Sequence, residues 1–130
     1  MEKNMQDCAM FALTLLHSAT NTHIQHLRVT GVGSYAAHKA LQGYYEAIPD
    51  LVDAVVESYQ GKYGLITDYP NSYHPAPKEP LAYLESLQKF VQEARGSLPQ
   101  DSELQNEVDN IQNLINSTVY KLRNLKWWSV

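Results

Sequence analysis

The chain has 130 residues, of which 44% are hydrophobic and 18% charged, and a formal net charge of −4. This size and balance predict one globular domain, residues 1–130, with enough apolar residues to bury a core. No apolar run of about 18 residues is present, and the N-terminus lacks a signal-peptide pattern. The single cysteine, Cys8, excludes an internal disulfide, so we expect a cytoplasmic protein with no membrane partner. The mild acidity and the lack of a Lys/Arg run argue against nucleic acid as a partner.

The first helix is expected from about residue 2 to residue 28. Small and apolar residues recur in it at alternating spacings of four and three, which places them on one side of a helix: Cys8, Ala12, Leu15, Ala19, Thr22 and His26. Because the stripe ends in His26, we expect that imidazole to point inward. Taken alone, His26 is a core histidine bonded to a backbone carbonyl. His17 and His23 lie off the stripe and are expected in solvent or in an interface.

A turn at residues 30–34 and a second helix from Ser34, a good N-cap, to near Gly61 are predicted next. Its apolar stripe comprises Leu41, Tyr45, Ile48, Val52, Val55 and Tyr59. A polar stripe lies about 110° around the helix from it and comprises His38, Gln42, Glu46, Asp53 and Glu57. This polar side is expected to meet another subunit, and the alternative is a solvated face. Pro49 is expected to kink the helix.

Two histidines and two acids stand out in this hairpin. His26 and His38 each lie six positions from Val32, so an antiparallel hairpin places their imidazoles level. Asp53 and Glu57, at i and i+4, project from one face. This N/O ligand set suits Fe(II), Zn(II) or Mn(II). However, the 15 residues from His38 to Asp53 span about 22 Å of helix, so one chain cannot surround an ion with all four. Two copies packed antiparallel about a two-fold axis would form two equivalent sites.

The second half of the chain predicts a long connection and two further helices. Residues 61–80 carry four prolines and read as a crossover that returns the chain along a bundle, with no role assigned to His74. A third helix is expected over 81–95, with its inner side formed by Leu81, Leu84, Leu87, Val91 and Ala94. A fourth follows Pro99 with a capping box of Ser102 and Gln105. Its apolar seam comprises Leu104, Val108, Ile111, Ile115, Thr118, Leu122 and Leu125.

Two features mark the end of the fourth helix. Its cations, Lys121, Arg123 and Lys126, are expected to offset the helix dipole rather than bind nucleic acid. Trp127 and Trp128 suggest a subunit contact or a lid over the end of the bundle. Short, long and short connections between four helices predict an all-α protein with the connectivity of a ferritin-like four-helix bundle.

Residues 26–57 resemble the Dps family of mini-ferritins, the dodecameric iron-oxidising proteins of bacteria. That family has a histidine within H-W-x-x-x-G, a second histidine twelve residues on, a carboxylate four later, and D-x-x-x-E eleven after that. Here the run is His26-Leu27-Arg28-Val29-Thr30-Gly31, followed at the same spacings by His38, Gln42, and the pair Asp53 and Glu57. The match covers about 35 residues.

The resemblance implies Fe(II) binding and oxidation, by peroxide or dioxygen, at non-haem sites with one or two irons that are shared across a two-fold interface. It implies His26, His38, Asp53 and Glu57 as ligands and catalytic residues, with Gln42 and Glu46 as further candidates. It also implies a homo-oligomer, a dodecamer or other closed shell, that stores iron or removes peroxide. Small ferritin-like proteins also occur in tailed viruses, so a virion-associated location is an alternative to the cytoplasm.

Three departures from the family pattern bear on this expectation. Gln42 replaces a carboxylate, and Leu27 replaces the tryptophan. The N-terminus lacks the basic tail with which some members bind DNA, because Lys3 stands beside Glu2 and Asp7. The third and fourth helices carry no histidine, which excludes the internal di-iron site of ordinary ferritins. The alternative function is therefore a non-catalytic ferritin-like assembly protein, and a helical adaptor that uses the two tryptophans is a third.

Overall fold

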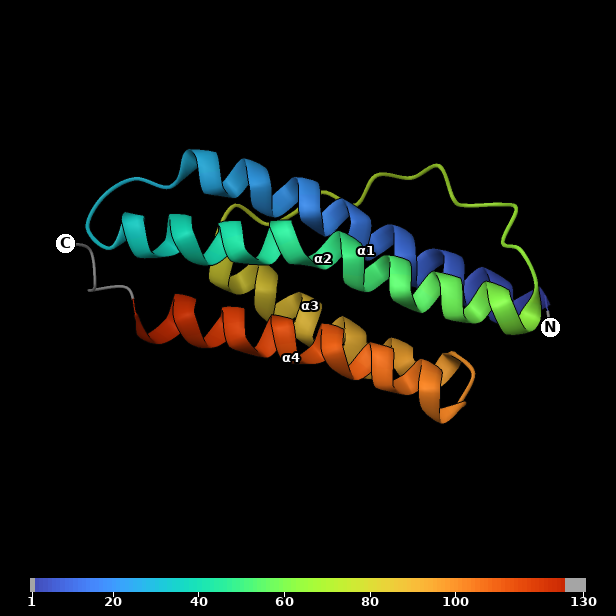
Figure 1. Cartoon of the computed structure of the whole chain (residues 1–130). Coiled ribbons are helices and arrows are strands. Elements are labelled where there is room, and N and C mark those ends of the chain that lie inside the picture. The colour runs from blue at the N-terminus through green and yellow to red at the C-terminus, as the bar shows by residue number, and fades with distance from the viewer. Residues whose placement is uncertain (1, 126–130) are drawn as a thin grey trace.

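Four amphipathic α-helices make up most of the structure, a computed structural model that describes residues 2–125 (Figure 1). They are α1 (Glu2–Arg28), α2 (Ser34–Tyr63), α3 (Pro80–Ala94) and α4 (Ser102–Asn124), and a 3-10 turn, Arg95–Ser97, follows α3. The protein is all-α over this range. None of the helices in residues 2–125 contains a stretch that is long and apolar enough to cross a membrane.

Nearest neighbours in the bundle run antiparallel. α1 and α4 run in one direction and α2 and α3 in the other (Figure 1). α1 packs most extensively on α2, α2 packs on α4, and α3 packs on α4. The connection of residues 64–79 returns along the bundle with no helix of its own, as predicted, and it lies against α1. It therefore allows α2 and α3 to be parallel.

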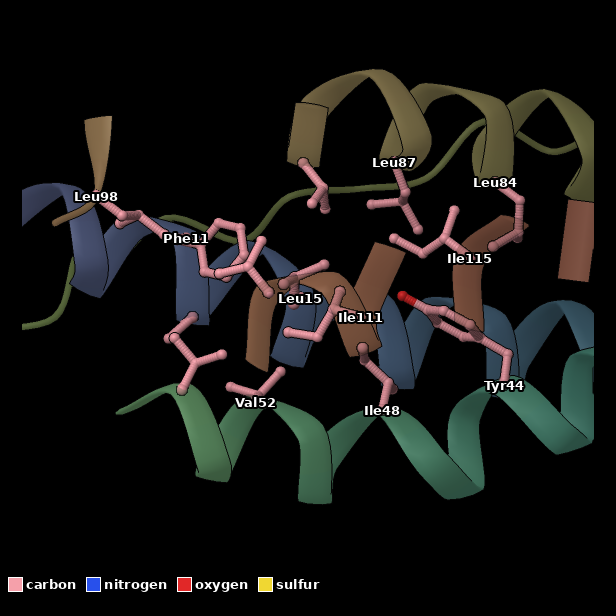
Figure 2. Packing of buried hydrophobic residues seen from close by; sticks show 14 of the residues in the cluster. Phe11, Leu15, Tyr44, Ile48, Val52, Leu84, Leu87, Leu98, Ile111 and Ile115 are labelled. Atoms are coloured by element: carbon pink, nitrogen blue, oxygen red, sulfur yellow. The ribbon is translucent and has the colours of Figure 1, made fainter. Parts of the chain in front are cut away.

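All four helices contribute to one core (Figure 2). Labelled examples are Phe11 and Leu15 of α1, Ile48 and Val52 of α2, Leu84 and Leu87 of α3, and Ile111 and Ile115 of α4. The seam predicted for α4 is buried from Leu104 to Leu122, while Leu125 is 36% exposed. The stripe predicted for α2 is wrong at one place. Tyr44 is fully buried there, whereas Tyr45 is only partly covered.

Two predicted helix caps are wrong. The residue that precedes α2 is Gly33, with φ of 81°, and Ser34 is already helical and makes no side-chain cap. Gly31 also has positive φ, 95°, and its carbonyl accepts the Ser34 N–H, so glycines rather than a serine side chain close this turn. At α4 the capping residue is Asp101, again without a side-chain cap.

The residues of the expected capping box of α4 have other partners. The amide of Gln105 donates to the carbonyls of Arg95 and Pro99, at 3.2 and 3.0 Å, so it ties the preceding turn to the helix. Near the other end of α4, Arg123 pairs with Glu85 of α3 at 2.7 Å. Lys126, Trp127 and Trp128 lie outside the described residues. α2 continues as one helix through Pro49.

Candidate functional site

His26 of α1 and His38 of α2 exchange hydrogen bonds across the hairpin. The Nδ1–H of His26 donates to the carbonyl of His38 at 2.6 Å, and the Nδ1–H of His38 donates to the carbonyl of His26 at 2.9 Å. Their rings stack, with centroids 3.5 Å apart and planes inclined by 18°. The prediction that these imidazoles lie level is confirmed. His26 is 7% exposed, as its place at the end of the apolar stripe predicted.

The local sequence explains why this pair forms. The last four carbonyls of a helix have no partner within it, and the carbonyl of His26 is one of these in α1. His38 satisfies that carbonyl from the neighbouring helix. The left-handed glycines at 31 and 33 make the turn tight enough for the first turns of α2 to face the last turns of α1. His26 and His38 therefore hold the two helices of the hairpin together, and we call this pair the histidine clasp.

The reciprocal bonds determine which ring nitrogens remain available. A carbonyl oxygen can only accept, so Nδ1 carries the proton in both rings. In the neutral imidazoles each Nε2 then holds a free lone pair, which is the form that binds a metal ion. Hydrogen bonding of one ring nitrogen to a backbone carbonyl also fixes ring orientation in metal sites of proteins. The two histidines thus meet the chemical requirements for ligands.

Further aromatic rings surround the pair. Tyr45 lies edge-on to His26, with centroids 5.2 Å apart, and stacks on His23 at 3.9 Å. Tyr35 lies beyond His38, at 6.4 Å between centroids. His23 and Tyr35 are exposed, so this aromatic cluster extends from the hairpin seam to the surface. Its packing limits the movement of both imidazoles.

The acidic candidates lie apart from the histidines on the exposed side of α2. Asp53 and Glu57 are both exposed, and neither forms a hydrogen bond or ion pair with any part of the chain that the structure describes. Gln42, between the two groups, accepts from Lys39 at 3.3 Å and donates to Glu46 at 3.2 Å. Glu46 is thus engaged by an amide on the same face.

A single chain does not assemble the four candidate ligands. Among residues 2–125, no group of three or more His, Cys, Asp or Glu side chains is arranged to hold a metal ion. The structure brings His26 and His38 together and leaves Asp53 and Glu57 further along α2. This separation agrees with the helical length between His38 and Asp53, which requires a second copy to complete any such site.

An apolar stripe on α1 faces away from the core. Leu16, Ile24 and Leu27 are 38%, 42% and 71% exposed. With the partly exposed Leu13 and the exposed Thr20, they recur at three- and four-residue spacings and so share one side of α1. Since the core side of α1 is occupied by Leu15, Thr22 and His26, no part of residues 2–125 covers this stripe.

A second histidine pair was not anticipated from the sequence. His17 of α1 and His74 of the 64–79 connection approach to 3.0 Å between their Nδ1 atoms. His17, which was expected in solvent or in an interface, is partly exposed and also contacts the connection, so His74 has a defined partner. The signal was present as the spacing His17, Asn21 and Gln25, which puts three hydrogen-bonding side chains on one face of α1.

A surface cavity of about 790 Å³ opens where α1 ends and α2 and α3 begin. Its lining includes Arg28, Val32, Lys78 and Leu122, but neither His26 nor His38. Gln25 also lines it and donates from Nε2 to the carbonyl of Pro77, while its Oε1 has no partner in the described part of the chain. The cavity is thus separate from the histidine clasp.

The model of a family of unknown function, DUF5856, matches residues 26–122, a region that begins at His26 and ends in the last turns of α4. No curated protein and no solved structure matches the chain significantly.

Proposed function

This chain belongs to the DUF5856 family, whose function is not established, and we propose that it is a mini-ferritin-like protein that binds and oxidises Fe(II) between subunits. The proposal rests on one observation above all. His26 and His38 hold their Nδ1 protons on each other's backbone carbonyls, which leaves both Nε2 lone pairs for a metal ion.

The exposed acids would supply the other half of each site. Asp53 and Glu57 have no partner among the described residues, so ion binding would not have to break an existing salt bridge. In an antiparallel pair of α2 helices related by a two-fold axis, each histidine pair meets the acids of the other copy. Imidazole nitrogens and carboxylate oxygens together suit Fe(II), and the carboxylate charge favours Fe(III) as product.

The outward face of α1 supports the association of copies. Its stripe of Leu13, Leu16, Thr20, Ile24 and Leu27 lies opposite the core and offers apolar area to a second subunit. The helix directions and the long connection between α2 and α3 are compatible with the connectivity of a ferritin-like bundle and support this part of the proposal. We therefore propose a homo-oligomer with two-fold interfaces, as a dodecamer or other closed shell.

The reaction would be the oxidation of ferrous substrate. Two Fe(II) ions each give one electron to hydrogen peroxide, whose O–O bond breaks, and two protons complete two water molecules. Dioxygen is the alternative oxidant. Gln42 supplies no charge at its position, so the second iron would be held less tightly than the first. The chain's own task is to hold the ions and to place acids beside imidazoles.

Anaerobic titration with Fe(II), followed by peroxide, tests the proposal. The wild-type protein should bind Fe(II) saturably and develop ferric absorbance on addition of peroxide. The double variant Asp53→Ala/Glu57→Ala should lose more than about tenfold in affinity, since even outer-shell changes at metal sites cost 10–100-fold. The matched control is Asp68→Asn/Glu93→Gln, which removes two exposed acids from the connection and from α3.

Two results would contradict this function. One is equal rates of iron oxidation in wild type and in the Asp53/Glu57 double variant. The other is a stable monomer at micromolar concentration by sedimentation, because a monomer provides only half of each site. Loss of oxidation in the Asp68/Glu93 control would show that overall charge, rather than the acids on α2, governs binding.

A structural role without catalysis is the second candidate. The hydrogen bond between Gln42 and Glu46 favours this role. A free carboxylate at the position of Gln42, next to His38 on the polar stripe, would bind iron, whereas the amide is neutral and already bonded. In that case the protein would still assemble through α1 and α2, but its iron oxidation would not exceed the background rate. Native mass and the iron titration together separate the two functions.

A further inference from the structure

Three side chains of α1 hold the backbone of the long connection. The Nδ1 of His17 accepts the backbone N–H of His74 at 3.1 Å, and the Nδ2 of Asn21 donates to the carbonyl of His74 at 2.7 Å. One turn further on, Gln25 donates to the carbonyl of Pro77 at 2.9 Å. The spacing of four between these side chains keeps them on one face of the helix, level with successive parts of the extended chain.

Side-chain contacts reinforce the same junction. The hydroxyl of Tyr73 donates to Oδ1 of Asn21, and the ring of Tyr73 lies 5.1 Å from that of His17. Asn21 also donates to the hydroxyl of Tyr83 at 3.0 Å, which links the junction to α3. Asn21 is 3% exposed and Tyr83 is 5% exposed, so this end of the junction is buried. By contrast, His17 is only partly covered and can exchange protons with solvent.

The bonding at His17 requires its neutral form. Its Nδ1 accepts a backbone N–H, so it carries no proton, and the Nδ1–H of His74 can donate to the same lone pair. If that nitrogen carried a proton, its N–H would point at the backbone N–H of His74 and could not accept from it. The hydrogen bond to the backbone would then be lost. Asn21 and Gln25 do not titrate, so His17 is the one member of the three α1 side chains that responds to pH.

We propose that His17 is a proton-sensitive latch that holds residues 64–79 on α1 at neutral pH and releases the segment around Tyr73 and His74 when it is protonated. Because this segment also forms one wall of the cavity beside Gln25, release would widen that cavity. The inference is independent of iron binding: none of these residues belongs to the proposed iron site.

The groups that face His17 favour the neutral ring. On the connection these are His74 and Tyr73, and on α3 Tyr83 reaches it through Asn21. No carboxylate in the described residues bonds to either ring of the pair. Burial, and secondly the like charge of His74, lower the pKa of His17 from its ordinary value of 6.5. The released segment leaves His17 with an ordinary pKa, so release takes up a proton.

The sign of the pH effect follows from this difference. The closed form, in which residues 64–79 lie on α1, is fully favoured above pH 6.5. As the pH falls below 6.5, the equilibrium constant for closing drops by up to about tenfold per pH unit, until the lowered pKa of His17 is passed. Hydrogen–deuterium exchange between pH 7.5 and 5, corrected for intrinsic rates, should show faster opening at the amide of His74, whose N–H is bonded to His17 in the closed form. Amides of the buried seam of α4 should keep their protection, which separates release from global unfolding.

Three variants isolate the latch. His17→Asn places an amide oxygen near the position of Nδ1 and cannot titrate, so its segment should stay protected to pH 5. His74→Gln keeps the backbone N–H but removes the like charge, and the release should move to higher pH. His23→Asn, an exposed histidine of α1 outside the junction, should respond as wild type.

Two outcomes would overturn the latch. One is a wild-type segment whose opening is independent of pH between 7.5 and 5. The other is a pH response that survives in His17→Asn. Should that variant fold poorly, the wild type alone decides: by nuclear magnetic resonance, the amide of His74 and the ring of His17 must titrate with one midpoint. Different midpoints would contradict the proposal.

Discussion

His26 and His38 each donate a ring N–H to the other's backbone carbonyl, at 2.6 and 2.9 Å, and thereby join the end of α1 to the beginning of α2. Neighbouring helices usually meet through side chains alone. Here each bond ends on a carbonyl, so the pair fixes both helix backbones and both ring orientations. Any ligand role of the imidazoles therefore builds on a structural role, and the two can be measured separately.

Replacing His38 by alanine should destabilise the fold. The change leaves the carbonyl of His26, one of the unsatisfied carbonyls at the end of α1, without its partner and removes the stacked ring. We expect a loss of about 1–3 kcal/mol in the free energy of unfolding, measured by denaturant titration. Lys39→Ala, at the exposed next position, should change it by less than about 0.5 kcal/mol. Equal effects would argue against the clasp.

The buried hydroxyls of Ser18 and Tyr44 should respond unequally to removal. They share a 2.8 Å hydrogen bond, and Ser18 also donates to the carbonyl of Leu15 at 2.5 Å. Tyr44→Phe leaves Ser18 with a partner and should cost about 1 kcal/mol, whereas Ser18→Ala strands a fully buried hydroxyl and should cost about 1–3 kcal/mol. Adding Tyr44→Phe to Ser18→Ala should recover stability in thermal unfolding. If the loss of stability in the double variant equals the sum of the two single losses, this coupling is refuted.

Gln105 should be needed at the turn between α3 and α4. Its amide bonds two carbonyls of the turn, and its Oε1 accepts from Nε of Arg95 at 3.0 Å. Gln105→Ala should lower the free energy of unfolding by about 1–3 kcal/mol, because these groups lose their partner together. Asn106→Ala, an exposed neighbour, is the control. If Gln105 acted only as a helix cap, Gln105→Glu would preserve stability; we expect it to be destabilising because a carboxylate cannot donate to carbonyls.

Cys8 should be unreactive in the folded protein. Its side chain is fully buried, and burial raises the pKa of the thiol to about 11. Because the thiolate is the reactive form, labelling by a thiol reagent at pH 8 should be slow and should accelerate in denaturant. A raised pKa also means that the stabilising contribution is complete below pH 9 and is lost as the pH rises toward 11. Rapid labelling of the native protein would contradict this burial.

Several features follow from the sequence alone. The helical period and the glycines at 31 and 33 determined the hairpin, and the equal distance of His26 and His38 from Val32 determined that their rings lie level. Both are local consequences of 3.6 residues per turn. The exposure of Asp53 and Glu57 likewise follows from their angle to the apolar stripe of α2.

Only the tertiary structure decided which partner each polar side chain has. Tyr44 rather than Tyr45 enters the core because adjacent residues differ by 100° around the helix, and the packing of α2 on α1 and α4 selects between them. Gln105 resembles a cap in the sequence but meets the turn that folds back beside it. His17 and His74 are 57 residues apart, and their contact depends on the path of an extended segment whose sequence has no period to read.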